Sequence, residues 1–181
     1  PDALDEALAL YHRDFRPSKR LSKPYAMLAL NVVAADSDAE ARRLFTSLQM
    51  RFANMARGVR GKLAPPIDDI ETYWSPIEKA QAERMLACSF AGSPETLRPD
   101  LEAFIAATQA DELMVNTAIY DHAARVRSYE NLAEATGQLE GYNSDGMHAC
   151  ITDGIQICRR TGKIGCVSCF REYACDVYLA A

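Results

Sequence analysis

The chain has 181 residues, of which 49% are hydrophobic and 25% charged, and its formal net charge is -5. These proportions are ordinary for a globular domain, and they argue against a collagen, a coiled coil or a largely disordered chain. The balance is acidic, no basic run exceeds a pair, and no apolar run approaches the roughly 20 residues that span a bilayer, so we expect neither nucleic acid nor a membrane as partner.

The N-terminal region is predicted to form a helix followed by a buried strand. Residues 2–15 place Leu4, Leu8 and Tyr11 at helical spacing, and we expect this stripe to pack against a sheet rather than to bind a partner. The helix is acidic and lacks the basic start of a signal peptide, which predicts a cytoplasmic protein. Residues 25–35 are almost continuously apolar. Periodicity alone fits a helix or a strand there, but a valine pair and a flanking proline favour a strand buried on both faces.

A long amphipathic helix and a long loop come next. The helix is expected over residues 38–56 and the loop over residues 58–74. Loops of this length are often lids, and Arg57, Arg60 and Lys62 would then be placed to clamp a phosphate or a substrate. A solvated connector is an equally good interpretation, because the composition of the loop favours plain exposure.

Two further helices carry clear start signals. Ser75 opens a capping box with a proline in the first helical position. A short strand is expected over residues 86–92, and Ser93 is predicted to cap the helix after it. The same turn offers exposed N–H groups that favour a phosphate. The cap is the preferred interpretation, because Glu95 would repel a phosphate.

The last strand and helix hold the candidate site. Residues 111–117 are predicted to form a strand, and Asp121 is expected to begin a helix. Parallel α/β folds place their sites at the carboxyl ends of strands. Asp121 has an alternative role as a helix cap, and for His122 a structural or solvent-facing role is favoured over catalysis. The side chains predicted to line a pocket are Asn31, Asn116, Thr117, Tyr120, Asp121 and His122.

The elements add up to about three β/α units followed by a tail of a different kind. The length falls short of the roughly 200 residues that a complete (β/α)8 barrel needs. The α/β pattern ends near Gly137, which divides the chain into residues 1–137 and a Cys-rich tail over 138–181. The tail is interpreted as disordered or read out of frame, with a short β-rich appendage as the alternative. Cys166 and Cys169 form a Cys-x-x-Cys pair, but no second pair at matching spacing accompanies it, so no metal site is expected.

Three blocks of the sequence resemble the C-terminal half of luciferase-like, flavin-dependent monooxygenases of the bacterial luciferase family. They fall within residues 1–135 and read PYAMLALNVVAADSDAEARRLFTSLQ, LACSFAGSPETLRPDLEAFIAATQADELMV and AIYDHAARVRSYENLAEA. The resemblance implies the C-terminal part of a TIM (β/α)8-type barrel, reduced FMN as cofactor, oxygen as oxidant, and an aldehyde or other small organic substrate. It implies a flavin reductase as a partner. It also implies that the N-terminal half supplies the catalytic groups, so no catalytic residue is assigned here.

Two functional hypotheses follow. The first is a part of an FMN-dependent monooxygenase that is incomplete on its own. The second is a non-enzymatic partial-barrel module that forms a homo-oligomer or docks on another chain, because three parallel strands leave unpaired edges. Flavin binding distinguishes the two hypotheses.

Overall fold

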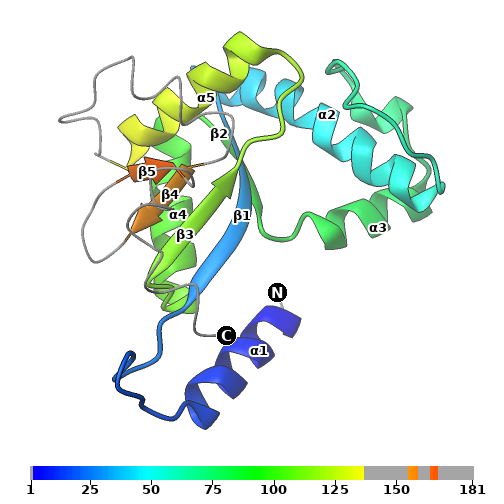
Figure 1. The fold of residues 1–181 in the computed structure, drawn as a ribbon. Coiled ribbons are helices and arrows are strands. Elements are labelled where there is room, and N and C mark those ends of the chain that lie inside the picture. Colours follow the sequence, from blue (N-terminus) through cyan, green and yellow to red (C-terminus); the bar gives the residue numbers. More distant parts are fainter. Residues whose placement is uncertain (1, 137–154, 159–163, 167–181) are drawn as a thin grey trace.

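The computed structural model describes residues 2–136, 155–158 and 164–166, and it places helices around a five-stranded sheet (Figure 1). The helices are α1 (Asp2–Asp14), α2 (Asp38–Ala56), the 3-10 turn η1 (Ile70–Thr72), α3 (Pro76–Met85), α4 (Pro94–Thr108) and α5 (His122–Ala135). The strands are β1 (Met27–Ala34), β2 (Ser89–Gly92), β3 (Glu112–Asn116), β4 (Ile155–Cys158) and β5 (Ile164–Cys166). Within the described residues, none of the helices combines the length and apolar character needed to cross a bilayer.

The sheet has the strand order β2-β1-β3-β4-β5. β1 runs parallel to both β2 and β3, which confirms the predicted parallel α/β core, whereas β4 pairs antiparallel with β3 and with β5. In a barrel wall, successive parallel strands stand side by side, but here β1 lies between β2 and β3. Sheets with such a reversal bind ligands near the carboxyl ends of the strands at the switch, here β1 and β3. The barrel stays a prediction.

Local sequence signals set the starts of three helices. Ser37 caps α2 through its hydroxyl. Ser75 and Glu78 form the predicted capping box at the start of α3. Asp121 caps α5 by accepting the N–H of Ala124 at 2.8 Å. Each cap satisfies N–H groups that have no partner inside the helix, which is why these helices begin where the sequence predicts.

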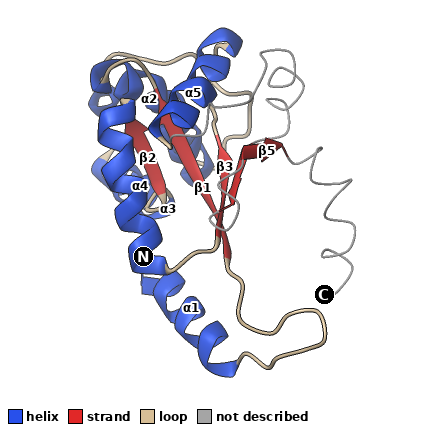
Figure 2. Ribbon diagram, turned by 90° about the vertical axis from the view of Figure 1, so that its left-hand side faces the viewer, coloured by secondary structure: helices blue, strands red, loops and turns tan. Residues whose placement is uncertain are grey.

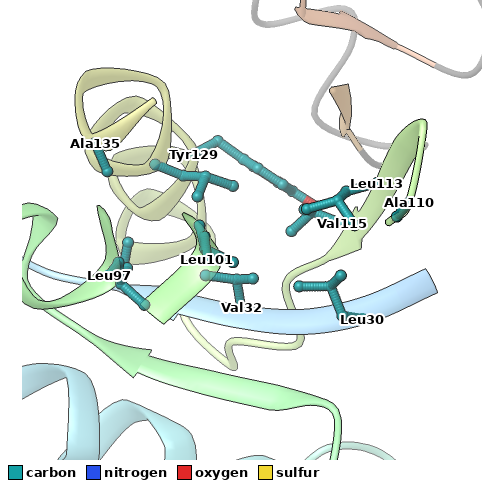
Figure 3. Close-up of a cluster of buried hydrophobic side chains, with 11 residues drawn as sticks. Leu30, Val32, Leu97, Leu101, Ala110, Leu113, Val115, Tyr129 and Ala135 are labelled. Atoms are coloured by element: carbon teal, nitrogen blue, oxygen red, sulfur yellow. The ribbon is translucent and has the colours of Figure 1, made fainter. Parts of the chain in front are cut away.

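The main core lies between the sheet and the helices α4 and α5. Leu30 and Val32 of β1 and Val115 of β3 pack with Leu97 of α4 and Tyr129 of α5 (Figure 3). Val32 and Leu97 are 0% exposed. Removing this apolar surface from water is the main stabilising contribution to such a fold.

The opposite face of the sheet is covered at one end. Val33 and Ala35 pack against Ala41 and Leu44 of α2. Closer to the start of β1, Ala29 is exposed. The prediction of a strand buried on both faces therefore holds for the end of β1 and is wrong at Ala29.

Helix α1 stands apart from the sheet, beyond the amino end of β1 (Figure 1, Figure 2). No side chain of residues 3–15 is buried, and Leu10 and Tyr11 are 51% and 37% exposed. The Tyr11 hydroxyl donates to the carbonyl of Tyr25 at 3.2 Å and accepts its N–H at 3.1 Å. The prediction that the α1 stripe packs on the sheet is wrong, because the apolar face of β1 is already occupied by α4 and α5.

Two strands lie within the region predicted as a tail. β4 and β5 extend the sheet beyond β3, so the sheet continues past the predicted boundary. Cys158 ends β4 and Cys166 ends β5. Cys150, Cys169 and Cys175 lie outside the described residues, and so does one half of the Cys-x-x-Cys pair. The origin of the tail stays a prediction.

Candidate functional site

A row of three polar side chains crosses the parallel strands where β3 ends. Asn31 of β1 is in register with Ser89 of β2 and with Asn116 of β3. Asn116 Nδ2 donates to Asn31 Oδ1 at 3.0 Å, and Asn31 Nδ2 donates to Ser89 Oγ at 3.2 Å. Two of the predicted site residues, Asn31 and Asn116, are thus brought together. We call Asn31, Ser89 and Asn116 the amide row.

The amide row lies on the face of the sheet opposite the main core. On this face Ala29 and Asn116 are exposed and Met114 is half-buried. Asn31 uses its oxygen and one N–H within the row. Among the contacts of the described residues, hydrogen-bonding capacity remains on the Asn116 oxygen, on the second N–H of each of the two amides, and on the Ser89 hydroxyl proton. The row can accept at the Asn116 end and donate along its length, beside an apolar surface.

Thr117 has a structural task next to the row. Its side chain is buried, with 4% exposed, and its hydroxyl donates to the carbonyl of Val32 at 2.8 Å. This bond ties the chain just after β3 to the central strand. Thr117 therefore holds Asn116 in place, and its hydroxyl proton is directed at the backbone rather than at a ligand.

The turn before α5 holds the other predicted residues. Tyr120 is 54% exposed. Asp121 caps α5, as its alternative role predicts. His122 Nδ1 lies 2.8 Å from Arg125 Nη2. Because a guanidinium only donates, Nδ1 is the acceptor in this contact. Asp121 and His122 are thus engaged with α5 itself, which supports the structural interpretation of both.

The start of α4 is closed by a carboxylate from α2. Asp38 accepts the backbone N–H of Ser93 at 2.7 Å and the hydroxyl of Thr96 at 3.1 Å. These bonds hold the pKa of the Asp38 carboxyl below its usual range, and the bond from the Ser93 backbone has the largest effect. Ser93 occupies the N-cap position, but its side chain accepts no N–H of α4. The prediction that the Ser93 side chain caps α4 is therefore wrong. Since an anion already sits at this helix start, the phosphate alternative loses its support.

Other polar contacts at the end of β1 were not predicted from the sequence. Asp36 Oδ1 accepts from Asn131 Nδ2 at 2.9 Å and from Arg127 Nε at 3.1 Å. Both bonds lower the pKa of Asp36, and the bond from Asn131 has the larger effect. Ser128 Oγ accepts the N–H of Ala34 at 2.8 Å. One signal pointed to this region, the acidic residues directly after the strand, but that signal also fits an ordinary helix start. These contacts fix α5 against the strand that carries the row.

The end of the loop over residues 58–74, the predicted lid, packs against α2 and α3. Trp74 is 8% exposed in a small core between these helices. Arg57 Nε and Nη2 donate to the two carboxylate oxygens of Glu78 at 2.7 and 3.0 Å. This ion pair favours the connector alternative for Arg57, and its role as a clamp stays a prediction. Arg60 and Lys62 are exposed.

Replacing Glu78 by glutamine should lower stability at neutral pH and have little effect in acid. The Arg57 guanidinium, followed by the Ser75 N–H, lowers the pKa of Glu78 to about 2. A carboxyl with a depressed folded pKa stabilises the fold above its unfolded pKa of about 4.3, and this contribution is lost as the pH falls through the folded value. The urea midpoint of the wild type should exceed that of Glu78→Gln at neutral pH, and the gap should close between about pH 4 and pH 2. A gap of constant size would contradict the assignment.

The sheet and the amide row together define an α/β protein with a row of polar side chains, the candidate site, on the sheet face opposite the main core. Ligands of such sheets bind near the strand ends, and the site rather than the fold decides the chemistry. Within the described residues, no group of three or more His, Cys, Asp and Glu side chains is arranged to hold a metal ion.

Homologues of this chain carry the name luciferase-like monooxygenase. This chain is 43% identical over 141 residues to a protein of that name from Escherichia coli (strain K12). The match covers 78% of this chain and 42% of the relative. The chain is also 43% identical over 128 residues to the uncharacterized protein YvbT of Bacillus subtilis, covering 71% and 38% of the two chains. The crystal structure of apo-MsnO8 superposes with a TM-score of 0.57 at 28% identity, covering 73% of this chain and 40% of that one. No family model matches the sequence.

The chain spans about two fifths of the length of the curated relatives it matches. The similarity agrees with the resemblance seen in the sequence. The activity of the whole protein, its cofactor and its partners are therefore proposals.

Proposed function

We propose that the chain forms part of a flavin-dependent monooxygenase, which uses reduced FMN and oxygen to oxidise an aldehyde or another small organic substrate. The observation that carries the proposal is the 43% identity over 141 residues with a protein named luciferase-like monooxygenase. A separate flavin reductase that supplies the reduced FMN, and a cytoplasmic location, belong to the same proposal.

The amide row suits the edge of a flavin ring better than a phosphate. A flavin ring edge carries carbonyl and N–H groups, and the row presents an acceptor on Asn116 and a donor on Ser89 beside an apolar surface. Phosphates bind at helix starts. The starts of α4 and α5 already hold the carboxylates of Asp38 and Asp121. The described residues therefore support contact with the ring and offer the phosphate no cradle at these two helices.

When bound, reduced flavin supplies the electrons that activate oxygen. The contribution of this chain is to orient the ring and to keep water from one side of it. Asn31 is bonded to both of its neighbours, so it fixes the spacing of the donor and the acceptor at the ends of the row. Ala29 and Met114 provide apolar surface beside it. Amides and hydroxyls do not titrate near neutral pH, so the row is assigned no proton transfer.

Equal affinity for riboflavin and FMN is the expected result for this chain alone. The two flavins share the ring and differ by the phosphate, for which the starts of α4 and α5 offer no cradle. Anaerobic titrations with the two reduced flavins should give dissociation constants within about twofold of each other. A preference for FMN of about tenfold or more would place a phosphate site in this chain. Failure of both flavins to bind at millimolar concentration would contradict the proposed ring contact.

The second candidate is a non-enzymatic module that binds another chain or itself. The exposure of Leu10 and Tyr11 on α1 favours this candidate, because exposed large apolar side chains are suited to an interface. A module of this kind would bind neither flavin and would form a stable complex in sedimentation experiments. The titration above therefore distinguishes the two candidates.

A further inference from the structure

Helices α2 and α3 form a hairpin that stands out from the sheet. Helix α2 begins after β1 and α3 ends before β2, so the end of α2 and the start of α3 lie at the far end of the hairpin (Figure 1). The Arg57 guanidinium joins the two helices there, with its Nε 2.7 Å from Glu78 Oε1. We call a set of exposed side chains at this end the hairpin tip, namely Arg51, Met55, Val59, Arg60, Lys62 and Ile77.

The hairpin tip has a large apolar part. Met55 is 51% exposed, Val59 53% and Ile77 81%. Val59 is held against the last turn of α2, because its N–H donates to the carbonyl of Asn54 at 2.8 Å and Gly58 takes the positive φ of 71° that this helix ending requires. Ile77 directly precedes the carboxylate of the ion pair that closes the hairpin. Local structure therefore fixes three apolar side chains at one end of the hairpin.

Unpaired cations accompany these apolar side chains. Residues 41–62 contain six Arg and Lys and no Asp or Glu, in a chain whose net charge is -5. Arg51, Arg60 and Lys62 are exposed, and within the described residues none of them forms an ion pair. The hairpin tip therefore carries positive charge that the described part of the fold does not neutralise.

Three carboxylates near the tip are already engaged. Glu78 pairs with Arg57, and Glu71 accepts from Lys79 Nζ at 2.7 Å. Asp69 accepts the N–H of Glu71 at 2.9 Å and so caps the turn η1. These groups therefore leave the three cations of the tip available to a partner of opposite charge.

A protruding surface of this composition suits a flat anionic boundary. Apolar side chains at its end can enter the border between headgroups and acyl chains, while neighbouring cations are attracted by anionic headgroups. The expectation of no membrane partner rests on runs along the sequence, in which basic residues occur at most as pairs. The hairpin instead gathers single cations around an apolar end.

We propose that the hairpin tip binds the surface of a membrane that contains anionic lipids. The binding is peripheral and reversible, because three apolar side chains and three cations hold a protein far less firmly than a spanning helix does. It agrees with the proposed cytoplasmic location, since the cytoplasmic leaflet carries the anionic lipids. The inference goes beyond the proposed function and needs no flavin. Failure of flavin binding would contradict the proposed function and leave this inference standing.

Co-sedimentation of the full 181-residue chain with vesicles tests the proposal. Vesicles made of equal parts of phosphatidylcholine and phosphatidylglycerol should bind the chain at least about tenfold more tightly than vesicles of phosphatidylcholine alone, and added salt should reduce this difference. Ile77→Glu and Arg60→Glu should each weaken binding to the anionic vesicles by about tenfold, because each brings a negative charge to the membrane surface.

Two variants away from the tip are the matched controls. Leu10→Glu on α1 makes an apolar-to-acidic change at a side chain that is 51% exposed, and Arg98→Glu changes an exposed arginine of α4. Both should bind the anionic vesicles like the wild type. All four positions are exposed, so each variant should stay folded, and thermal melts check this.

Three results would overturn the proposal. The first is the absence of binding to the anionic vesicles at low salt. The second is equal binding to neutral and anionic vesicles. The third is a loss in the control variants as large as the loss in Ile77→Glu and Arg60→Glu, which would place the contact elsewhere in the chain. A dimer that Ile77→Glu dissociates in sedimentation, together with no vesicle binding, would make a second copy the occupant of the tip.

Discussion

Replacing Asn31 by leucine should weaken the binding of reduced flavin by about tenfold or more. Asn31 makes both hydrogen bonds of the amide row, at 3.0 Å with Asn116 and at 3.2 Å with Ser89. Leucine has a similar size but can neither accept nor donate, so both outer groups lose their fixed orientation. The bound flavin would then lose its hydrogen bonds to these two groups, and two bonds of about 1 kcal/mol each correspond to somewhat more than a tenfold change in affinity. Anaerobic titration with reduced riboflavin measures the effect.

The control for this variant is Gln81→Leu, which makes the same amide-to-leucine change on the exposed surface of α3. It should bind flavin like the wild type. Because Asn31 is half-buried and its partners are side chains, the fold should tolerate the change, and a thermal melt checks this. Unchanged flavin affinity in a folded Asn31→Leu variant would show that the amide row does not contact the ring.

Replacing Leu97 by alanine should produce the largest loss of stability among the changes considered. Leu97 of α4 is 0% exposed and packs with the β1 residues Leu30 and Val32 in the main core. The substitution removes buried apolar surface and leaves a cavity that a well-packed core closes only in part. Such changes cost about 2–5 kcal/mol in the free energy of unfolding. Urea denaturation followed by circular dichroism measures the loss.

The matched control is Leu10→Ala on α1, where the side chain is 51% exposed. Its cost should stay within about 0.5 kcal/mol, because surface substitutions away from special features have small effects. Equal costs at Leu97 and Leu10 would contradict the description of the core, since they would mean that α1 is packed as tightly as α4.

Local structure could be predicted from the sequence where short-range chemistry decides it. Ser75 and Glu78 begin a helix because the capping box closes within four residues, whatever surrounds it. The strand within residues 25–35 was predictable because a valine pair and a flanking proline favour a strand over a helix. Asp121 as the cap of α5 belongs to the same group.

Contacts between distant elements could not be predicted in this way. The hydrogen bond from the Ser93 N–H to Asp38 joins residues that are 55 positions apart, and nothing in the sequence near Ser93 predicts a carboxylate of α2 as its acceptor. The position of β1 between β2 and β3 is likewise invisible in the strand sequences, because an apolar strand fits the centre or the edge of a sheet. The exposure of α1 was missed because an amphipathic stripe shows that a helix has an apolar partner, not where that partner is.

The candidate site shows the same division. Asn31 and Asn116 were identified as polar residues in apolar strands, and the sheet register brings them together. Ser89 was missed, because a serine at the start of a short strand carries no signal of its own. Thr117, Asp121 and His122 were correctly placed near the ends of elements, but their hydrogen bonds go to the backbone or to Arg125. Position could be predicted for these residues, whereas the hydrogen-bond partners of Thr117 and His122 could not.

The ratio of FMN affinity to riboflavin affinity of this chain tests the central claim most directly. The proposed function assigns contacts with the flavin ring to the amide row, and the starts of α4 and α5 are already occupied by the carboxylates of Asp38 and Asp121. The ratio should therefore be near one, because the two flavins share the ring and differ by the phosphate. A ratio of about ten or more would contradict this assignment, since charge-assisted bonds to phosphate are the strong ones.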